Sequence, residues 1–124
     1  MNLNQVTVAA HDMPKSVAFY QKLGLTLIVD TPHYARFECP DGESTFSLHK
    51  VDQKPPINDT IIYFECAGLD REYQRLLDAG IDFIQAPTDQ RWLWREARLY
   101  DPSDNQVCLF WGGENRKNPP WRVN

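Results

Sequence analysis

The sequence has no long apolar run and too few cysteines for a framework of disulfides. Its cysteines, Cys39, Cys66 and Cys108, are odd in number, and no two are spaced as CxxC, which favours reduced thiols over a zinc knuckle. No segment approaches the roughly 20 apolar residues that cross a membrane. The start, MNLNQVTVAAHD, lacks the basic residues and apolar block of a signal peptide. We therefore expect a cytoplasmic protein with no membrane partner.

Positive charge is also scarce. Lys and Arg number 13 against 17 Asp and Glu, a net charge of −4, and the basic residues are scattered along the chain. A nucleic acid partner is therefore not expected, because a phosphate backbone needs a basic stripe to follow. GxGxxG, P-loop, HxH and HExxH patterns are all missing, so no local motif supports nucleotide or zinc binding.

The sequence contains the same predicted order of secondary-structure elements twice. Strand, helix and turn signals predict a strand, a helix and three strands over 3–10, 11–24, 25–30, 33–40 and 44–51. After a polar connector the same order is predicted over 60–67, 69–80, 81–86, 92–101 and 105–111. A chain of 124 residues suits one domain. We divide it into module one (about 1–52), a linker (53–58), module two (about 59–112) and a C-terminal arm (113–124).

Local matches support the duplication. KLGLTLI (22–28) aligns with DAGIDFI (78–84) at an offset of 56 residues, so that Gly24 and Gly80 end the two helices. Asp12 is expected to cap the first helix, and Leu69, Tyr73, Leu76 and Leu77 to share one face of the second. The expected fold is α+β, with two tandem βαβββ modules forming a cupped, partly closed mixed sheet around a small-molecule cavity.

Three segments make the chain resemble a known family: VTVAAHDMPKSVAFYQKLGL, FECAGLDREYQRLLDAGIDF and DPSDNQVCLF. In this order they are similar to the vicinal oxygen chelate superfamily, which includes glyoxalase I, extradiol dioxygenases, fosfomycin-resistance enzymes and bleomycin-binding proteins. The resemblance implies the paired-module fold and commonly a homodimer. It also implies a divalent metal held by one His or Glu from each of four strands.

The resemblance carries those four metal positions onto Gln5, Ser47, either Thr60 or Ile61, and Cys108. None of these side chains is the expected His or Glu, and a single thiol among them would make a weak site. We therefore expect no metal and no other cofactor. The alternative is a divalent metal held by displaced ligands, since His49 and Glu65 follow family positions by an even number of strand residues.

A segment rich in tryptophan is a second candidate for a ligand-binding site, apart from the four metal positions. In QRWLWREARLYD, Trp92, Trp94, Glu96 and Arg98 alternate onto one strand face and Arg95, Ala97 and Leu99 onto the other, with Tyr63 expected beside the first set. Amphipathic packing with the arginines reaching solvent would explain the same pattern. The residues expected to line the cavity are Gln5, Ser47, His49, Ile61, Tyr63, Glu65, Trp92, Trp94, Arg98 and Cys108.

Three functions are compatible with this pattern. The first is a metal-free protein of this superfamily that binds a small molecule, with dimerisation completing the cavity. The second is a glyoxalase-like lyase, isomerase or dioxygenase, either metal-dependent through displaced ligands or metal-independent with Glu65 or His49 as the catalytic base. The third is an interaction module without a small ligand, whose cavity would be filled by side chains. The arm, with Trp121, is expected to lie over the surface.

Overall fold

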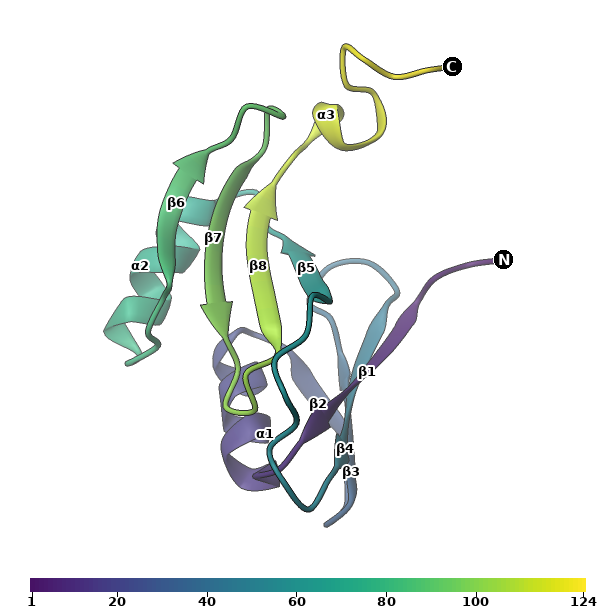
Figure 1. Ribbon diagram of the computed structural model, residues 1–124, viewed down its shortest axis with the longest axis vertical. Coiled ribbons are helices and arrows are strands. Elements are labelled where there is room, and N and C mark those ends of the chain that lie inside the picture. Colours follow the sequence, from purple (N-terminus) through teal and green to yellow (C-terminus); the bar gives the residue numbers. More distant parts are fainter. The chain divides into compact units, whose positions relative to one another are not determined.

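The computed structural model describes residues 1–124 (Figure 1). The chain forms two compact units: residues 1–58 with 101–105, and residues 59–100 with 106–124. Each unit contains one open four-stranded sheet. No helix is long and apolar enough to cross a membrane.

The first unit contains β1 (Gln5–Ala10), α1 (Met13–Lys22), β2 (Thr26–Asp30), β3 (Tyr34–Glu38) and β4 (Thr45–Lys50). Its strand order is β1-β4-β3-β2, with β1 parallel to β4 and the other pairs antiparallel. The Asp12 carboxylate accepts a hydrogen bond from the Lys15 amide at 3.1 Å, which confirms the expected cap of α1.

The core of this unit is aromatic and lies between α1 and the sheet. Tyr20 of α1 is fully buried, and its ring centroid lies 4.4 Å from that of Phe46 and 6.0 Å from that of Phe37. Because side chains alternate along a strand, the neighbours of these two phenylalanines point to the opposite side of the sheet. We call this the helix-distal face of the first unit; it carries Gln5, Thr7, Tyr34, Arg36, Thr45, Ser47 and His49.

Residues 101–105 complete the first unit through the buried carboxylate of Asp101. Its oxygens accept hydrogen bonds from the Tyr20 hydroxyl (2.7 Å), the Ser103 amide (2.8 Å), and the amide and side chain of Asn105 (2.9 and 2.8 Å). Burial, together with this carboxylate, raises the pKa of Tyr20 well above its usual value. The conformation of the DPSDN turn is therefore stabilised by hydrogen bonds to the side chain of its first residue, Asp101.

The second unit contains β5 (Ile61–Glu65), α2 (Leu69–Asp78), β6 (Gln85–Asp89), β7 (Arg95–Tyr100), β8 (Gln106–Trp111) and the short α3 (Glu114–Lys117). Its strand order is β5-β8-β7-β6, with β5 parallel to β8. Leu69 and Leu76 of α2 are buried, Tyr73 is half-buried and Leu77 is 38% exposed, so the apolar stripe of this helix is narrower than expected.

The two units repeat one another in strand register. In the first, Ser47 pairs with Thr7 on one side and Arg36 on the other. In the second, Cys108 pairs with Tyr63 and Arg98 in the same way. Gly24 and Gly80 follow the two helices with φ of 105° and 87°, values that favour glycine. The α+β fold with two tandem βαβββ modules is thus confirmed, but the strands form two separate open sheets and not one partly closed sheet.

Two strands begin well after their predicted first residues. The strand predicted over 81–86 lies at 85–89, because Ile81 is buried and its amide bonds Leu76 O at the end of α2. Pro87 is tolerated there since β6 is an edge strand. The strand predicted over 92–101 begins at Arg95, because Leu93, with φ of 70°, lies in the turn before it.

Candidate functional site

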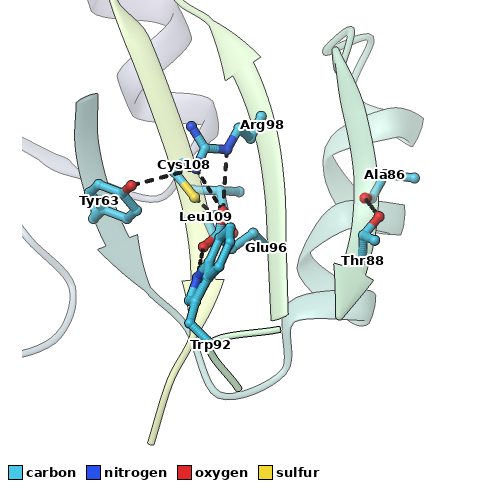
Figure 2. Close-up of polar contacts among 8 residues, drawn as sticks. All are labelled: Tyr63, Ala86, Thr88, Trp92, Glu96, Arg98, Cys108 and Leu109. Carbon is cyan, nitrogen blue, oxygen red and sulfur yellow. Dashed lines mark hydrogen bonds and ion pairs between the residues drawn. The ribbon is translucent and has the colours of Figure 1, made fainter. Parts of the chain in front are cut away.

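A buried carboxylate organises the helix-distal face of the second unit, which carries Tyr63, Glu96, Arg98, Cys108 and Phe110. Glu96 is 1% exposed. Its Oε1 accepts hydrogen bonds from Nη2 and Nε of Arg98 at 2.7 and 3.2 Å, and its Oε2 accepts one from the Trp92 indole at 2.7 Å (Figure 2). The Glu96 carboxylate therefore fixes the orientation of both the Arg98 guanidinium and the Trp92 indole.

Aromatic rings surround this charged pair. Tyr63 meets Trp94 and Phe110 edge to face, with centroids 5.9 and 5.5 Å apart, and Trp94 stacks on Phe110 at 4.6 Å. The guanidinium carbon of Arg98 lies 5.9 Å from the Tyr63 ring centroid, close enough for a cation–π contact. Tyr63 and Trp92 remain 42% and 37% exposed, so their rings are available for stacking.

Cys108 lies between Tyr63 and Arg98 in the strand register and is fully buried. Burial first, and then the nearby Glu96 carboxylate, raise the pKa of this thiol to about 12. Cys108 is thus a neutral thiol near pH 7, and nucleophilic attack by a thiolate is not favoured there.

We expect Cys108 to resist alkylation in the native protein. With a pKa of about 12, only about 10⁻⁴ of the thiol is ionised at pH 8. Cys66, which is half-buried, provides the comparison within the same unit. Mass spectrometry after brief iodoacetamide treatment should find Cys66 labelled and Cys108 unlabelled until urea is added; equal labelling rates in the native protein would contradict this.

The helix-distal face of the first unit carries a polar cluster instead. Gln5 Nε2 donates to Ser47 Oγ at 2.7 Å, and Tyr34 Oη lies 2.7 Å from the same oxygen. Arg36 Nε donates to Tyr34 Oη at 2.9 Å. The Thr45 hydroxyl donates to Gln5 Oε1. The structure thus brings together Gln5 and Ser47, the two family metal positions of this unit, as a hydrogen-bonded pair.

The four metal positions do not fit a divalent ion. Ile61, the first residue of β5, pairs with Gln106 as Gln5 pairs with Thr45, which selects Ile61 over Thr60 as the third position. Gln5, Ser47, Ile61 and Cys108 offer neither imidazole nor carboxylate. No group of three His, Cys, Asp or Glu side chains in the chain could hold a metal ion.

Glu65 and His49, the expected catalytic residues, lie in different units. Glu65 Oε2 accepts hydrogen bonds from the amides of Gly112 and Gly113 at 3.0 Å each, and Arg116 lies 3.5 Å from Oε1. This carboxylate therefore holds the start of the C-terminal arm. His49 is exposed on β4, opposite Tyr34.

A groove of about 710 Å³ lies elsewhere in the first unit, beside the start of α1. His11, Asp12, Val17 and Lys50 contribute to its walls. His11 Nδ1 lies 2.8 Å from the hydroxyl of Ser103, which is 1% exposed. None of the residues expected from the sequence to line a cavity contributes to this groove.

The expected site did not include Glu96, Tyr34 or Arg36 of these faces. Glu96 shares the face of Arg98, and strand alternation alone was a sufficient signal. The sequence signal for Tyr34 and Arg36 was weaker, because only the pairing of β3 with β4 brings these residues close to Ser47.

Two α+β units with the same element order and the same strand register define a protein built from paired βαβββ modules. The chain belongs to the Glyoxalase/Bleomycin resistance protein/Dioxygenase superfamily, whose family model matches residues 2–109. No curated protein matches the sequence significantly.

Solved structures agree with this assignment. A glyoxalase/bleomycin resistance protein/dioxygenase from Nocardioides is 26% identical, with a TM-score of 0.78 over 100% of this chain and 90% of that one. A bleomycin-binding protein complexed with bleomycin is 17% identical (TM-score 0.75; 91% and 99% covered). Lactoylglutathione lyase from Agrobacterium tumefaciens is 19% identical (TM-score 0.74; 90% and 93% covered). The last two likenesses show the fold alone.

Proposed function

We propose that this protein binds a small organic ligand without a metal, on the helix-distal face of its second unit. The observation that carries the proposal is an arginine held by a buried carboxylate beside exposed aromatic rings, namely Arg98, Glu96, Tyr63 and Trp92. Small-molecule sites combine aromatic walls with a few oriented polar groups in this manner.

The polar group available to a ligand is the outer edge of Arg98. Nε and Nη2 donate hydrogen bonds to Glu96, and Nη2 also donates to the Tyr63 hydroxyl at 3.5 Å, while Nη1 makes no hydrogen bond within the chain. Since Glu96 already balances the charge of the guanidinium, the ligand needs a hydrogen-bond acceptor and not a full negative charge. An unsaturated ring stacked on Tyr63 or Trp92, with an acceptor oxygen or nitrogen near its edge, matches this arrangement.

Independence from metal is supported by the chemistry of the residues at the family positions. Gln5 and Ser47 are hydrogen-bonded to one another, and neither they nor Ile61 and Cys108 provide an imidazole or a carboxylate. We infer that binding free energy comes from stacking and from Arg98. The bleomycin-binding relative is known from a complex with bleomycin, so bleomycin and simpler planar heteroaromatic amides are reasonable probes.

A thermal-shift screen of the full chain with these probes tests the proposal. A probe at 100 times its Kd stabilises the folded state by about 2.7 kcal/mol, and we expect a shift of several degrees for at least one probe. The shift should be equal with and without EDTA. A shift that disappears with EDTA and returns with Zn²⁺, or no shift with any probe, would count against a metal-free binding site.

A matched pair of variants locates the site. Arg98→Lys keeps the charge but loses the planar fork, and should weaken the bound probe at least about tenfold in a tryptophan-fluorescence titration. Arg95→Lys is the control, because Arg95 lies on the opposite face of β7 and pairs with Asp70 and Asp89. Equal affinities in the two variants would place the ligand elsewhere.

Sedimentation with and without the probe tests the homodimer that the family resemblance implies.

A further inference from the structure

A second arginine lies at the edge of the helix-distal face of the second unit. Arg116 of α3 is held by Glu65, whose Oε1 lies 3.5 Å from Arg116 Nε. Glu65 shares this face with Tyr63, because the two residues are two positions apart on β5. The terminal nitrogens of Arg116 make no hydrogen bond within the chain, and its side chain is 48% exposed. Arg116 can therefore donate hydrogen bonds to a ligand without losing a contact.

The strand register places two glutamates on opposite sides of β8. Both pair with Phe110, Glu65 from β5 and Glu96 from β7. Neighbouring strands lie about 4.8 Å apart, so the Cα atoms of the two glutamates are separated by roughly 10 Å. Each carboxylate contacts a different arginine: Arg98 on the β7 side and Arg116 on the β5 side. The aromatic surface around Phe110 is therefore flanked by two guanidinium groups, each with its own carboxylate.

Two contacts fix the backbone that carries Arg116. Glu65 Oε2 accepts a hydrogen bond from the Gly112 amide at 3.0 Å. The indole Nε1 of Trp94 lies 3.5 Å from the carbonyl oxygen of Asn115. A Cβ atom on Gly112 would lie only 3.0 Å from the same indole nitrogen, so the chain passes against this ring with no space for a side chain. The position of Arg116 is thus set by the aromatic cluster of the ligand face itself.

We propose that Arg116 is a specificity-determining residue that selects planar ligands with a hydrogen-bond acceptor at each end. This inference rests on the proposed function, in which the ring of the ligand stacks on Tyr63 and one acceptor binds Arg98. The opposite acceptor binds the terminal nitrogens of Arg116. Because each guanidinium already has a carboxylate partner, neutral acceptors such as amide oxygens are sufficient. Glu65 is a positioning residue for Arg116.

Two related amides test this selection. Isothermal titration calorimetry of the full chain compares naphthalene-2-carboxamide, which has one acceptor end, with naphthalene-2,6-dicarboxamide, which has two. We expect the native protein to bind the dicarboxamide about tenfold more tightly, as is typical for one further hydrogen bond to a charged group. Arg116→Gln should remove this preference and leave the affinity for the monocarboxamide unchanged. Lys117→Gln is the matched control, because it removes a positive charge from the next residue of α3 and should keep the preference.

Each contrary result has a distinct meaning. Equal native affinities for the two amides, or a preference retained in Arg116→Gln, would overturn the role of Arg116 and leave the site at Arg98 intact. Loss of both amides in Arg116→Gln would also overturn it, because Arg116 would then support the whole face and not one acceptor. Failure of the native protein to bind either amide would count against the proposed function, and this inference would fall with it.

A second variant tests the positioning by Glu65. Glu65→Ala keeps Arg116 but removes the carboxylate that holds it, so the preference for the dicarboxamide should fall toward that of Arg116→Gln. The affinity for the monocarboxamide shows that the face is still folded, because Tyr63 and Arg98 are unchanged, and we expect it to match the native value. An undiminished preference in Glu65→Ala, or loss of the monocarboxamide, would refute the assignment of Glu65 as a positioning residue.

Discussion

Replacing Asp101 by alanine should lower the free energy of unfolding by about 3 to 5 kcal/mol. This carboxylate is 3% exposed and accepts hydrogen bonds from Tyr20, Ser103 and Asn105. Its removal leaves the fully buried Tyr20 hydroxyl without an acceptor and frees the turn before β8. Urea unfolding followed by far-ultraviolet circular dichroism measures the loss.

A matched substitution within the same turn provides the control. Asp101→Asn keeps the size of the side chain but turns an N–H₂ group toward its donors, and should still cost about 2 to 3 kcal/mol. Asp104→Asn removes only a partly exposed ion pair with Lys54, and asparagine tolerates the φ of 61° at that position. Its cost should stay below about 1 kcal/mol. Similar losses in the two Asn variants would show that the Asp101 network contributes little.

Replacing Glu96 by alanine should cost about 2 to 4 kcal/mol, because it removes one partner of a largely buried ion pair. Arg98, whose side chain is 27% exposed, keeps its charge without a counterion, and the Trp92 indole loses its acceptor. The partial exposure of Arg98 places the estimate below that for a fully buried pair. The same urea experiment applies.

Glu72→Ala is the comparison for this variant. Glu72 pairs with Arg75 on the exposed side of α2, and such helix pairs contribute about 0.5 kcal/mol or less. A double-mutant cycle of Glu96→Ala with Arg98→Met should give a coupling energy of at least about 1 kcal/mol. A coupling near zero would contradict the view that Glu96 orients Arg98, and would weaken the case for a ligand at this face.

Local signals in the chain predicted most of the fold. Asp12 caps α1 and Gly24 follows it because capping and left-handed conformations depend on single residues. The repeat of 56 residues was visible because both helices end at such a glycine. The sixth strand was displaced because the end of α2 engages Ile81, a contact that no pattern of alternation contains.

The candidate sites were only partly predictable. Strand alternation placed Arg98 and Glu96 on one face, but the depth of Glu96 depends on the rings packed around it. Trp92 was expected on a strand, yet it lies in a turn and reaches Glu96 through its indole. Glu65 was expected to be a catalytic base, and its bonds to Gly112 and Gly113 come from residues 47 and 48 positions away.

The sequence by itself determined the order of elements, the duplication and the faces on which side chains lie, because these depend on periodicity and on single turn residues. Only the tertiary structure decided which polar atoms meet: Ser47 with Tyr34, Tyr20 with Asp101, and Glu96 with Arg98. Hydrogen bonds require atoms to lie within a few tenths of an ångström of an optimal distance. Strand pairing and packing set that distance, and neither can be predicted from the local spacing of residues.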